Sequence, residues 1–142
     1  MAIAGATAAG PTAHADPVGG GCYGGTLNVR GVADFRQNFL GAVTNCAGPA
    51  LPGIIAGSVD VTTVNAIQNG LFAPSLPLNG VIRWSNGETS DVSGAKSQET
   101  RLRLRFDLNI TGGPGAGGRL TLVAVKPDED SSTYTVLTAN FA

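Results

Sequence analysis

The side chains that most enzymes use for acid–base and nucleophilic chemistry are scarce in this chain. Its only histidine, His14, lies in an N-terminal stretch that we expect to be removed. Without an imidazole, neither a Ser-His-Asp nor a Cys-His mechanism is available, and no imidazole can bind a metal. Cys22 and Cys46 are too far apart for a CxxC redox motif, and two thiols alone do not make a zinc site. The sequence therefore predicts a non-enzymatic chain without cofactor or metal.

Carboxylates are the remaining candidates for catalysis. A glycosidase needs two carboxyl groups that face each other across a cleft. Four acids come into question, although each is more simply a solvated residue of a strand or turn: Asp60, Glu88, Asp91 and Asp107. A carbohydrate-active enzyme that uses two carboxylates stays open as the alternative function.

Two short motifs resemble ligand sites but stand in the wrong context. Residues 113–118 match G-x-G-x-x-G, yet a dinucleotide-binding loop must open a helix, and a strand pattern follows here. We therefore expect a flexible hairpin loop. Asp128, Glu129 and Asp130 offer oxygen ligands for calcium, but the EF-hand pattern is absent and the sequence favours a solvated turn.

Four side chains are candidates for binding a partner. Trp84 is the single tryptophan, and an exposed indole would suit a sugar ring or a protein contact. Alternation places it on the same face as Ile82, however, and this favours a core position. Three arginines form a stripe that could bind an anionic glycan or a protein, or could simply prevent edge pairing of a strand. They are Arg101, Arg103 and Arg105.

The elements that must carry these residues have the patterns of β-strands. Over residues 100–111 apolar side chains alternate strictly with polar ones, so that five of them should share one buried face. These five are Leu102, Leu104, Phe106, Leu108 and Ile110. Further strands are expected at 22–32, 54–67, 119–125 and 133–141. The pattern predicts an all-β fold, an antiparallel sandwich or barrel of about six to eight strands.

The connections between the strands differ in how clearly the sequence marks them. Asn86-Gly87 within residues 81–92 predicts a hairpin with a type I′ turn, since both central residues of that turn need positive φ. Residues 33–45 fit either a helix or an irregular strand or loop. Pro74 and Pro77 bracket an expected loop. A rigid loop over residues 71–78 would suit a protease inhibitor, which is a third functional hypothesis.

Composition excludes several classes of protein. Nine basic and ten acidic residues among 142 leave a net charge of −1, whereas nucleic-acid binders carry a basic excess. No apolar run reaches the roughly 18 residues of a membrane-spanning helix. The 21 glycines fit strands that are joined by tight turns. We therefore expect one domain that neither binds nucleic acid nor spans a membrane.

The N-terminus and the cysteines indicate export. Residues 1–15 are uncharged and end in Ala13-His14-Ala15, the small-residue pattern that signal peptidase accepts. The positive start of a signal peptide is missing, so residues 1–15 are predicted to be a signal-peptide remnant, or alternatively a flexible tail. The folded domain then spans residues 16–142. In an oxidising compartment Cys22 and Cys46 would form a structural disulfide.

Two motifs resemble a family of small secreted β-proteins of actinobacteria. One is the hairpin Trp84-Ser85-Asn86-Gly87-Glu88-Thr89-Ser90, and the other is Cys46 followed by a Pro-Gly-Ile step that ends at Gly57. The resemblance covers about a third of the chain and implies export and a β fold, without any assigned activity. Our leading hypothesis is a secreted, non-enzymatic β-domain that acts by surface binding to a protein or cell-envelope partner.

Overall fold

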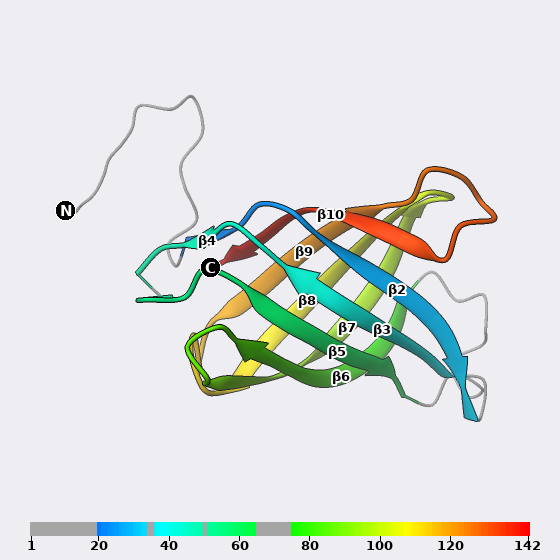
Figure 1. The fold of residues 1–142 in the computed structure, drawn as a ribbon. Coiled ribbons are helices and arrows are strands. Elements are labelled where there is room, and N and C mark those ends of the chain that lie inside the picture. Colours follow the sequence, from blue (N-terminus) through cyan, green and yellow to red (C-terminus); the bar gives the residue numbers. More distant parts are fainter. Residues whose placement is uncertain (1–19, 34–35, 50, 65–74) are drawn as a thin grey trace.

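The computed structural model describes residues 20–33, 36–49, 51–64 and 75–142, and it is built almost entirely of β-strands (Figure 1). The described residues form ten strands. They are β1 (Gly21–Cys22), β2 (Gly25–Val32), β3 (Arg36–Val43), β4 (Cys46–Ala47), β5 (Gly57–Thr63), β6 (Ser75–Trp84), β7 (Thr89–Thr100), β8 (Arg103–Gly112), β9 (Arg119–Val125) and β10 (Thr133–Phe141).

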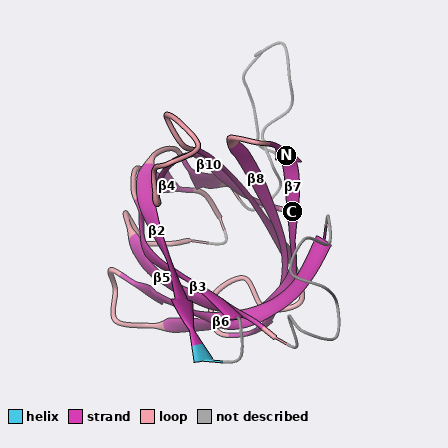
Figure 2. Ribbon diagram, turned by 90° about the vertical axis from the view of Figure 1, so that its right-hand side faces the viewer, coloured by secondary structure: helices cyan, strands magenta, loops and turns pink. Residues whose placement is uncertain are grey.

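Eight of these strands close into an antiparallel barrel, which decides between the two predicted architectures. The sheet runs β2-β3-β5-β6-β7-β8-β9-β10, and β10 pairs again with β2 through residues such as Tyr134 and Leu27. The view along the strands shows the closed wall (Figure 2). The short strands β1 and β4 extend the sheet beyond β10 at one end. Closure leaves the eight strands without a free edge along the paired wall.

The interior of the barrel is filled by the alternate residues of each strand. An eight-stranded barrel is just wide enough for side chains to fill it. At its centre Phe39 of β3 and Phe106 of β8 meet edge to face, with ring centroids 5.0 Å apart. Val59, Val61 and Thr63 of β5 are all buried on the inner face.

The predicted strand at 100–111 is confirmed except at its first residues. Four of its five apolar side chains are buried: Leu104, Phe106, Leu108 and Ile110. Leu102 is only half-buried, because it lies in the turn between β7 and β8 together with Arg101. The prediction was therefore wrong for these two residues, since the chain already turns where the alternation begins.

The structure also changes or decides two other expected segments. The strand expected at 22–32 is divided into β1 and β2, because Gly24 and Gly25 both have positive φ. The ambiguous segment 33–45 contains a strand, β3, and the helical structure among its described residues is limited to a 3₁₀ turn at Ala33. Its helix-like spacing misled because Phe39 and Val43 also occupy one face of a strand.

The predicted loop around Pro77 is wrong in its described half. Pro77 lies inside β6, and the neighbouring Leu76 and Leu78 are each 2% exposed. Pro77 sits just beyond the last residue pair of β5 with β6, where the missing N–H costs little. The first half of the loop proposed for a protease inhibitor, residues 71–74, lies outside the described residues, and the second half is strand.

The hairpin between β6 and β7 is confirmed, but its turn is not type I′. Gly87 has a φ of 91°, whereas Asn86 does not have positive φ. The N–H of Gly87 donates to the carbonyl of Trp84 at 2.9 Å, and the N–H of Trp84 donates to the carbonyl of Glu88 at 2.8 Å. This is a three-residue hairpin loop in which the glycine alone takes the left-handed conformation. Asn-Gly signals both kinds of turn, which explains the error.

The disulfide between Cys22 and Cys46 is confirmed. The two cysteines face each other on β1 and β4, with their Cα atoms 3.9 Å apart. Both are buried beside the barrel end that contains Trp84.

Of the helical structure in the described residues, nothing is long and apolar enough to cross a membrane.

Candidate binding surface

Trp84 belongs to the core, so its role as an exposed platform is excluded. Its side chain is 3% exposed and lies against Phe141, with ring centroids 5.8 Å apart. The indole Nε1 donates to Ser90 Oγ at 2.7 Å, and that hydroxyl donates to the carbonyl of Pro114 at 2.6 Å. These hydrogen bonds connect the β6–β7 hairpin to the loop at residues 113–118, between β8 and β9. The core position that alternation favoured is confirmed.

Arg103 and Arg105 lie on the outer wall of β8, as predicted, but acids neutralise them. Arg103 Nε is 2.8 Å from Glu99 Oε1, and Arg105 Nε is 3.0 Å from Asp107 Oδ2. A further contact of 3.5 Å joins Arg105 Nη1 to Glu99 Oε2. Because β8 has a partner on each side, these arginines protect no edge. They form a mixed-charge network rather than a cationic stripe.

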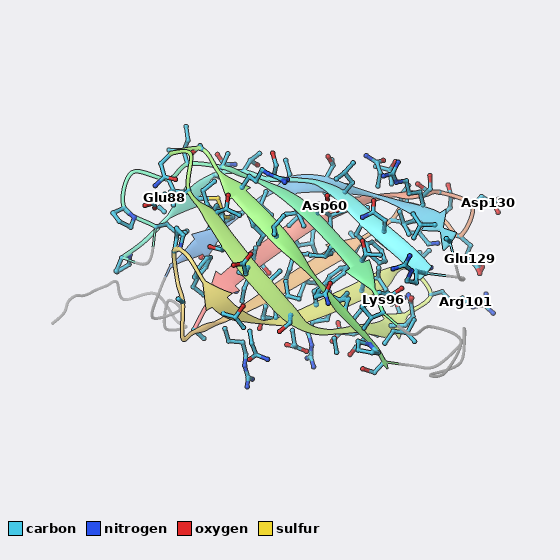
Figure 3. All side chains as sticks on the ribbon, turned by 90° about the horizontal axis from the view of Figure 1, so that it is seen from below. Asp60, Glu88, Lys96, Arg101, Glu129 and Asp130 are labelled. Atoms are coloured by element: carbon cyan, nitrogen blue, oxygen red, sulfur yellow. A yellow bond between two sulfur atoms is a disulfide. The ribbon has the colours of Figure 1, made fainter. Side chains whose placement is uncertain are left out.

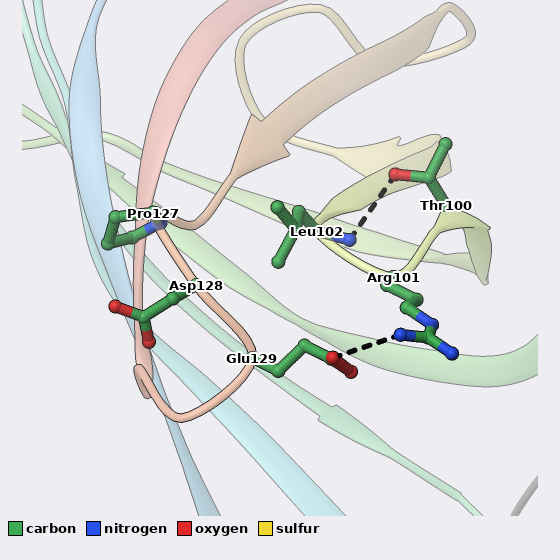
Figure 4. A pocket seen from close by; sticks show the side chains of 6 residues that line it. All are labelled: Thr100, Arg101, Leu102, Pro127, Asp128 and Glu129. Carbon is green, nitrogen blue, oxygen red and sulfur yellow. Dashed lines mark hydrogen bonds and ion pairs between the residues drawn. The ribbon is translucent and has the colours of Figure 1, made fainter.

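Arg101 is separated from the other two arginines and lies at one end of the barrel. Its Nη1 is 3.2 Å from Oε1 of Glu129, which comes from the loop between β9 and β10 (Figure 4). Both side chains are well exposed, at 83% and 57%. An exposed ion pair of this kind contributes about 0–1 kcal/mol to stability. These two charges therefore remain available to a partner.

Beside this ion pair the surface is hollowed. The hollow has a volume of about 550 Å³ and lies between the β7–β8 turn and the β9–β10 loop. Leu102 and Pro127 give it apolar walls, while Arg101 and Glu129 form a charged rim (Figure 4). The remaining lining comes from Thr100 and Asp128. An apolar base with a polar rim is the usual anatomy of a small protein contact.

The acidic residues of the β9–β10 loop have structural partners. The N–H of Asp130 donates to Asp128 Oδ1 at 3.0 Å, which closes the turn. Lys126 Nζ donates to the carbonyl of Glu129 at 3.1 Å. Within the four described ranges no three metal-binding side chains gather. The loop thus has the geometry of a solvated turn.

The four carboxylates considered for catalysis are spread over the molecule. Asp60 accepts from Asn38 Nδ2 on the outer wall, and Glu88 accepts from Asn86 Nδ2 in the hairpin turn, both at 2.9 Å. Asp107 pairs with Arg105 and lines a shallow outer hollow over Gly94 and Ala95. Asp91 pairs in register with Gly112 at the far end of β8. The carboxylate enzyme remains an untested prediction.

Lys96 was not predicted from the sequence, and it is the one charged residue among the buried polar residues of the described chain. It is 7% exposed, and its Nζ donates to Gln37 Oε1 at 2.9 Å. The ammonium lies 5.7 Å from the centroid of the Phe39 ring. Burial lowers the pKa of Lys96 below its usual value. The only sequence signal was that Lys96 is in phase with Val92, and this alone does not show which face of β7 is buried.

Lys96 and the hollow lie toward the same end of the barrel. Figure 3 shows Lys96, Arg101 and Glu129 toward one end of the barrel, with Glu88 at the opposite end. Neither protein-family models nor curated proteins nor solved structures gave a match to the chain. The resemblance to secreted actinobacterial proteins therefore stays a prediction, and the function must be argued from the geometry alone.

Proposed function

We propose that this chain is an exported, non-enzymatic binding domain that contacts a protein of the cell envelope through the barrel end formed by Arg101 and Glu129. The single observation that carries the proposal is the hollow at that end, with its apolar walls and exposed charged rim. On the outer wall of β8, Arg103 and Arg105 are already paired with acids. The disulfide between Cys22 and Cys46 supports export, since such bonds persist in oxidising compartments.

The closed barrel also supports contact through loops. A partner cannot add a strand along a wall whose strands are all paired, so side chains and loops must carry recognition. The β7–β8 turn and the β9–β10 loop come from neighbouring hairpins, and the rigid wall holds them together. This arrangement presents a fixed surface at low entropic cost.

The test is co-sedimentation of the labelled domain with envelope preparations from the producing cells, before and after protease treatment. We expect sedimentation that protease abolishes and that Arg101→Glu reduces at least about tenfold, because like charges at a contact repel. The control is Arg83→Glu, an exposed arginine at the opposite end of the barrel. Sedimentation that survives protease treatment would contradict the proposal.

The charge swap Arg101→Glu with Glu129→Arg separates recognition from stability. The swap restores an ion pair but exchanges the positions of the charges. A partner that reads these charges will still bind poorly, whereas a purely structural pair would be rescued. Full recovery of sedimentation in the swapped variant would therefore also count against this surface.

A further inference from the structure

A second hollow lies on the outer wall of the barrel, and its described lining shares no residue with the hollow at Arg101. It has a volume of about 360 Å³, and the residues around it come from three neighbouring strands, β7, β8 and β9. Its floor lies over Gly94 and Ala95, where no side chain is longer than a methyl group. Ala95 pairs in register with Asp107 of β8, so their side chains share the outer face. The short side chains of β7 therefore leave room for a ligand beside the longer ones of β8.

The rim of this hollow offers both donors and acceptors of hydrogen bonds. The carboxylate of Asp107 accepts, the guanidinium groups of Arg105 and Arg119 donate, and the amide of Asn109 does both. Asn109 and Arg119 are exposed, and they pair in register on β8 and β9. A sugar presents neighbouring hydroxyl groups, each of which donates one hydrogen bond and accepts others. The rim thus has the mixed chemistry that such hydroxyl groups require.

Contacts within the wall hold the polar groups of Asp107 and Arg105 in place. Arg105 Nε is 3.0 Å from Asp107 Oδ2, and Thr121 Oγ1 donates to Asp107 Oδ1 at 3.4 Å. Arg105 Nη1 also lies 3.5 Å from Glu99 Oε2. Each carboxylate oxygen of Asp107 has a second lone pair, so these contacts leave it able to accept from a ligand. Because both side chains are already oriented, a ligand that binds them has less ordering entropy to overcome.

The charges around the hollow favour a neutral ligand. The guanidinium groups of Arg105 and Arg119 are accompanied by the carboxylates of Asp107 and Glu99. An anion attracted by the arginines would lie close to these carboxylates, and like charges repel. A neutral molecule rich in hydroxyl groups can instead bond to donors and acceptors at the same time.

We propose that this outer-wall hollow binds a neutral sugar unit, which rests on Ala95 and directs two neighbouring hydroxyl groups toward Asp107 and Asn109. The first hydroxyl donates to the carboxylate and accepts from Arg105, and Arg119 donates to the second. Because the hollow is shallow, we expect a dissociation constant on the order of 1 mM. Binding of this strength is too weak to sediment the domain by itself. The site is therefore independent of the protein contact proposed at Arg101, and either can fail without the other.

The test is a titration of the ¹⁵N-labelled protein with three methyl pyranosides that differ in configuration. They are methyl α-D-glucopyranoside, methyl α-D-mannopyranoside and methyl β-D-galactopyranoside. We expect at least one of them to give saturable shifts of the backbone amides of Ala95, Asp107 and Arg119. Cyclohexanol, a ring with a single hydroxyl group, and acetate at constant ionic strength should each bind at least about tenfold more weakly. The absence of a saturable shift with all three pyranosides, or an equal affinity for cyclohexanol or acetate, would overturn the proposal.

Two pairs of variants locate the site. Ala95→Val fills the floor and should abolish the saturable shifts, whereas Ala42→Val, the same change at a half-buried outer position of β3, should leave them unchanged. Asp107→Asn removes the charged acceptor and should weaken binding at least about tenfold, while Asp60→Asn on the outer wall of β5 should not. Fluorescence of the buried Trp84 verifies the fold of each variant. Wild-type binding in Ala95→Val or in Asp107→Asn would overturn the assignment to this hollow.

Discussion

At the scale of single residues, buried polar groups contribute to the specificity of this core. Ser90 is fully buried and serves two groups at once, since it accepts from the Trp84 indole and donates to the Pro114 carbonyl. Ser90→Ala would leave both groups without their partner. We expect this to lower the free energy of unfolding by about 2 kcal/mol, as measured by urea denaturation.

The matched control for Ser90 is Ser93→Ala on the same strand. Ser93 faces the outer wall and is only half-buried, so its replacement should change stability by less than about 0.5 kcal/mol. Equal losses in the two variants would mean that the hydrogen bonds of Ser90 add nothing to stability. The single tryptophan reports the same change, because loss of the hydrogen bond at Nε1 should alter its fluorescence.

Lys96 makes stability depend on pH in a direction that can be derived. Burial lowers its pKa in the folded protein below the ordinary 10.5, so the unfolded chain binds the proton more readily. Stability from this group is therefore greatest above pH 10.5, where lysine is neutral in both states. It is lost progressively as the pH falls below that value toward the folded pKa.

The comparison that isolates this effect is wild type against Lys96→Met over about pH 8–11. The variant should gain on the wild type as the pH falls, because other ionisable groups are common to both proteins. Chemical denaturation at each pH measures the difference. A constant difference across this range would show that Lys96 keeps its ordinary pKa when folded.

At the scale of elements, glycine conformation decides whether the hairpins close. Gly87 has a φ of 91°, and a Cβ atom added to it would meet no described atom within 4 Å. A substitution at this position is therefore penalised by the backbone conformation alone. Gly87→Ala should cost about 1 kcal/mol, measured as a shift in the urea midpoint. Gly31→Ala is the control, since Gly31 also has open space but no positive φ. A larger loss for Gly31→Ala would contradict this account.

At the scale of the whole molecule, the alternation of apolar and polar residues predicted the strands. It did not predict features that depend on the closure of the sheet into a barrel. Residues 119–125 and 133–141 were predicted to the residue, because alternation and turn signals agree there. Whether β10 pairs with β2 is decided by contacts more than a hundred residues apart, so sandwich and barrel stayed open. Arg101 was assigned to the strand because a turn can continue an alternating pattern. Lys96 was missed because the local pattern does not say which alternating face closes inward.

The disulfide tests how far the barrel depends on its ends. Cys22 and Cys46 lie on β1 and β4, outside the eight strands that close the wall, and they are 24 residues apart. Reduction should therefore cost about 3 kcal/mol through the entropy of the unfolded chain while leaving the barrel folded. The measurement is urea unfolding with and without reductant, together with far-ultraviolet circular dichroism. A Cys22→Ala, Cys46→Ala variant controls for side reactions of free thiols. Loss of the β-sheet signal on reduction, without denaturant, would contradict this expectation. It would show that the pairing of β10 with β2 depends on the disulfide between β1 and β4.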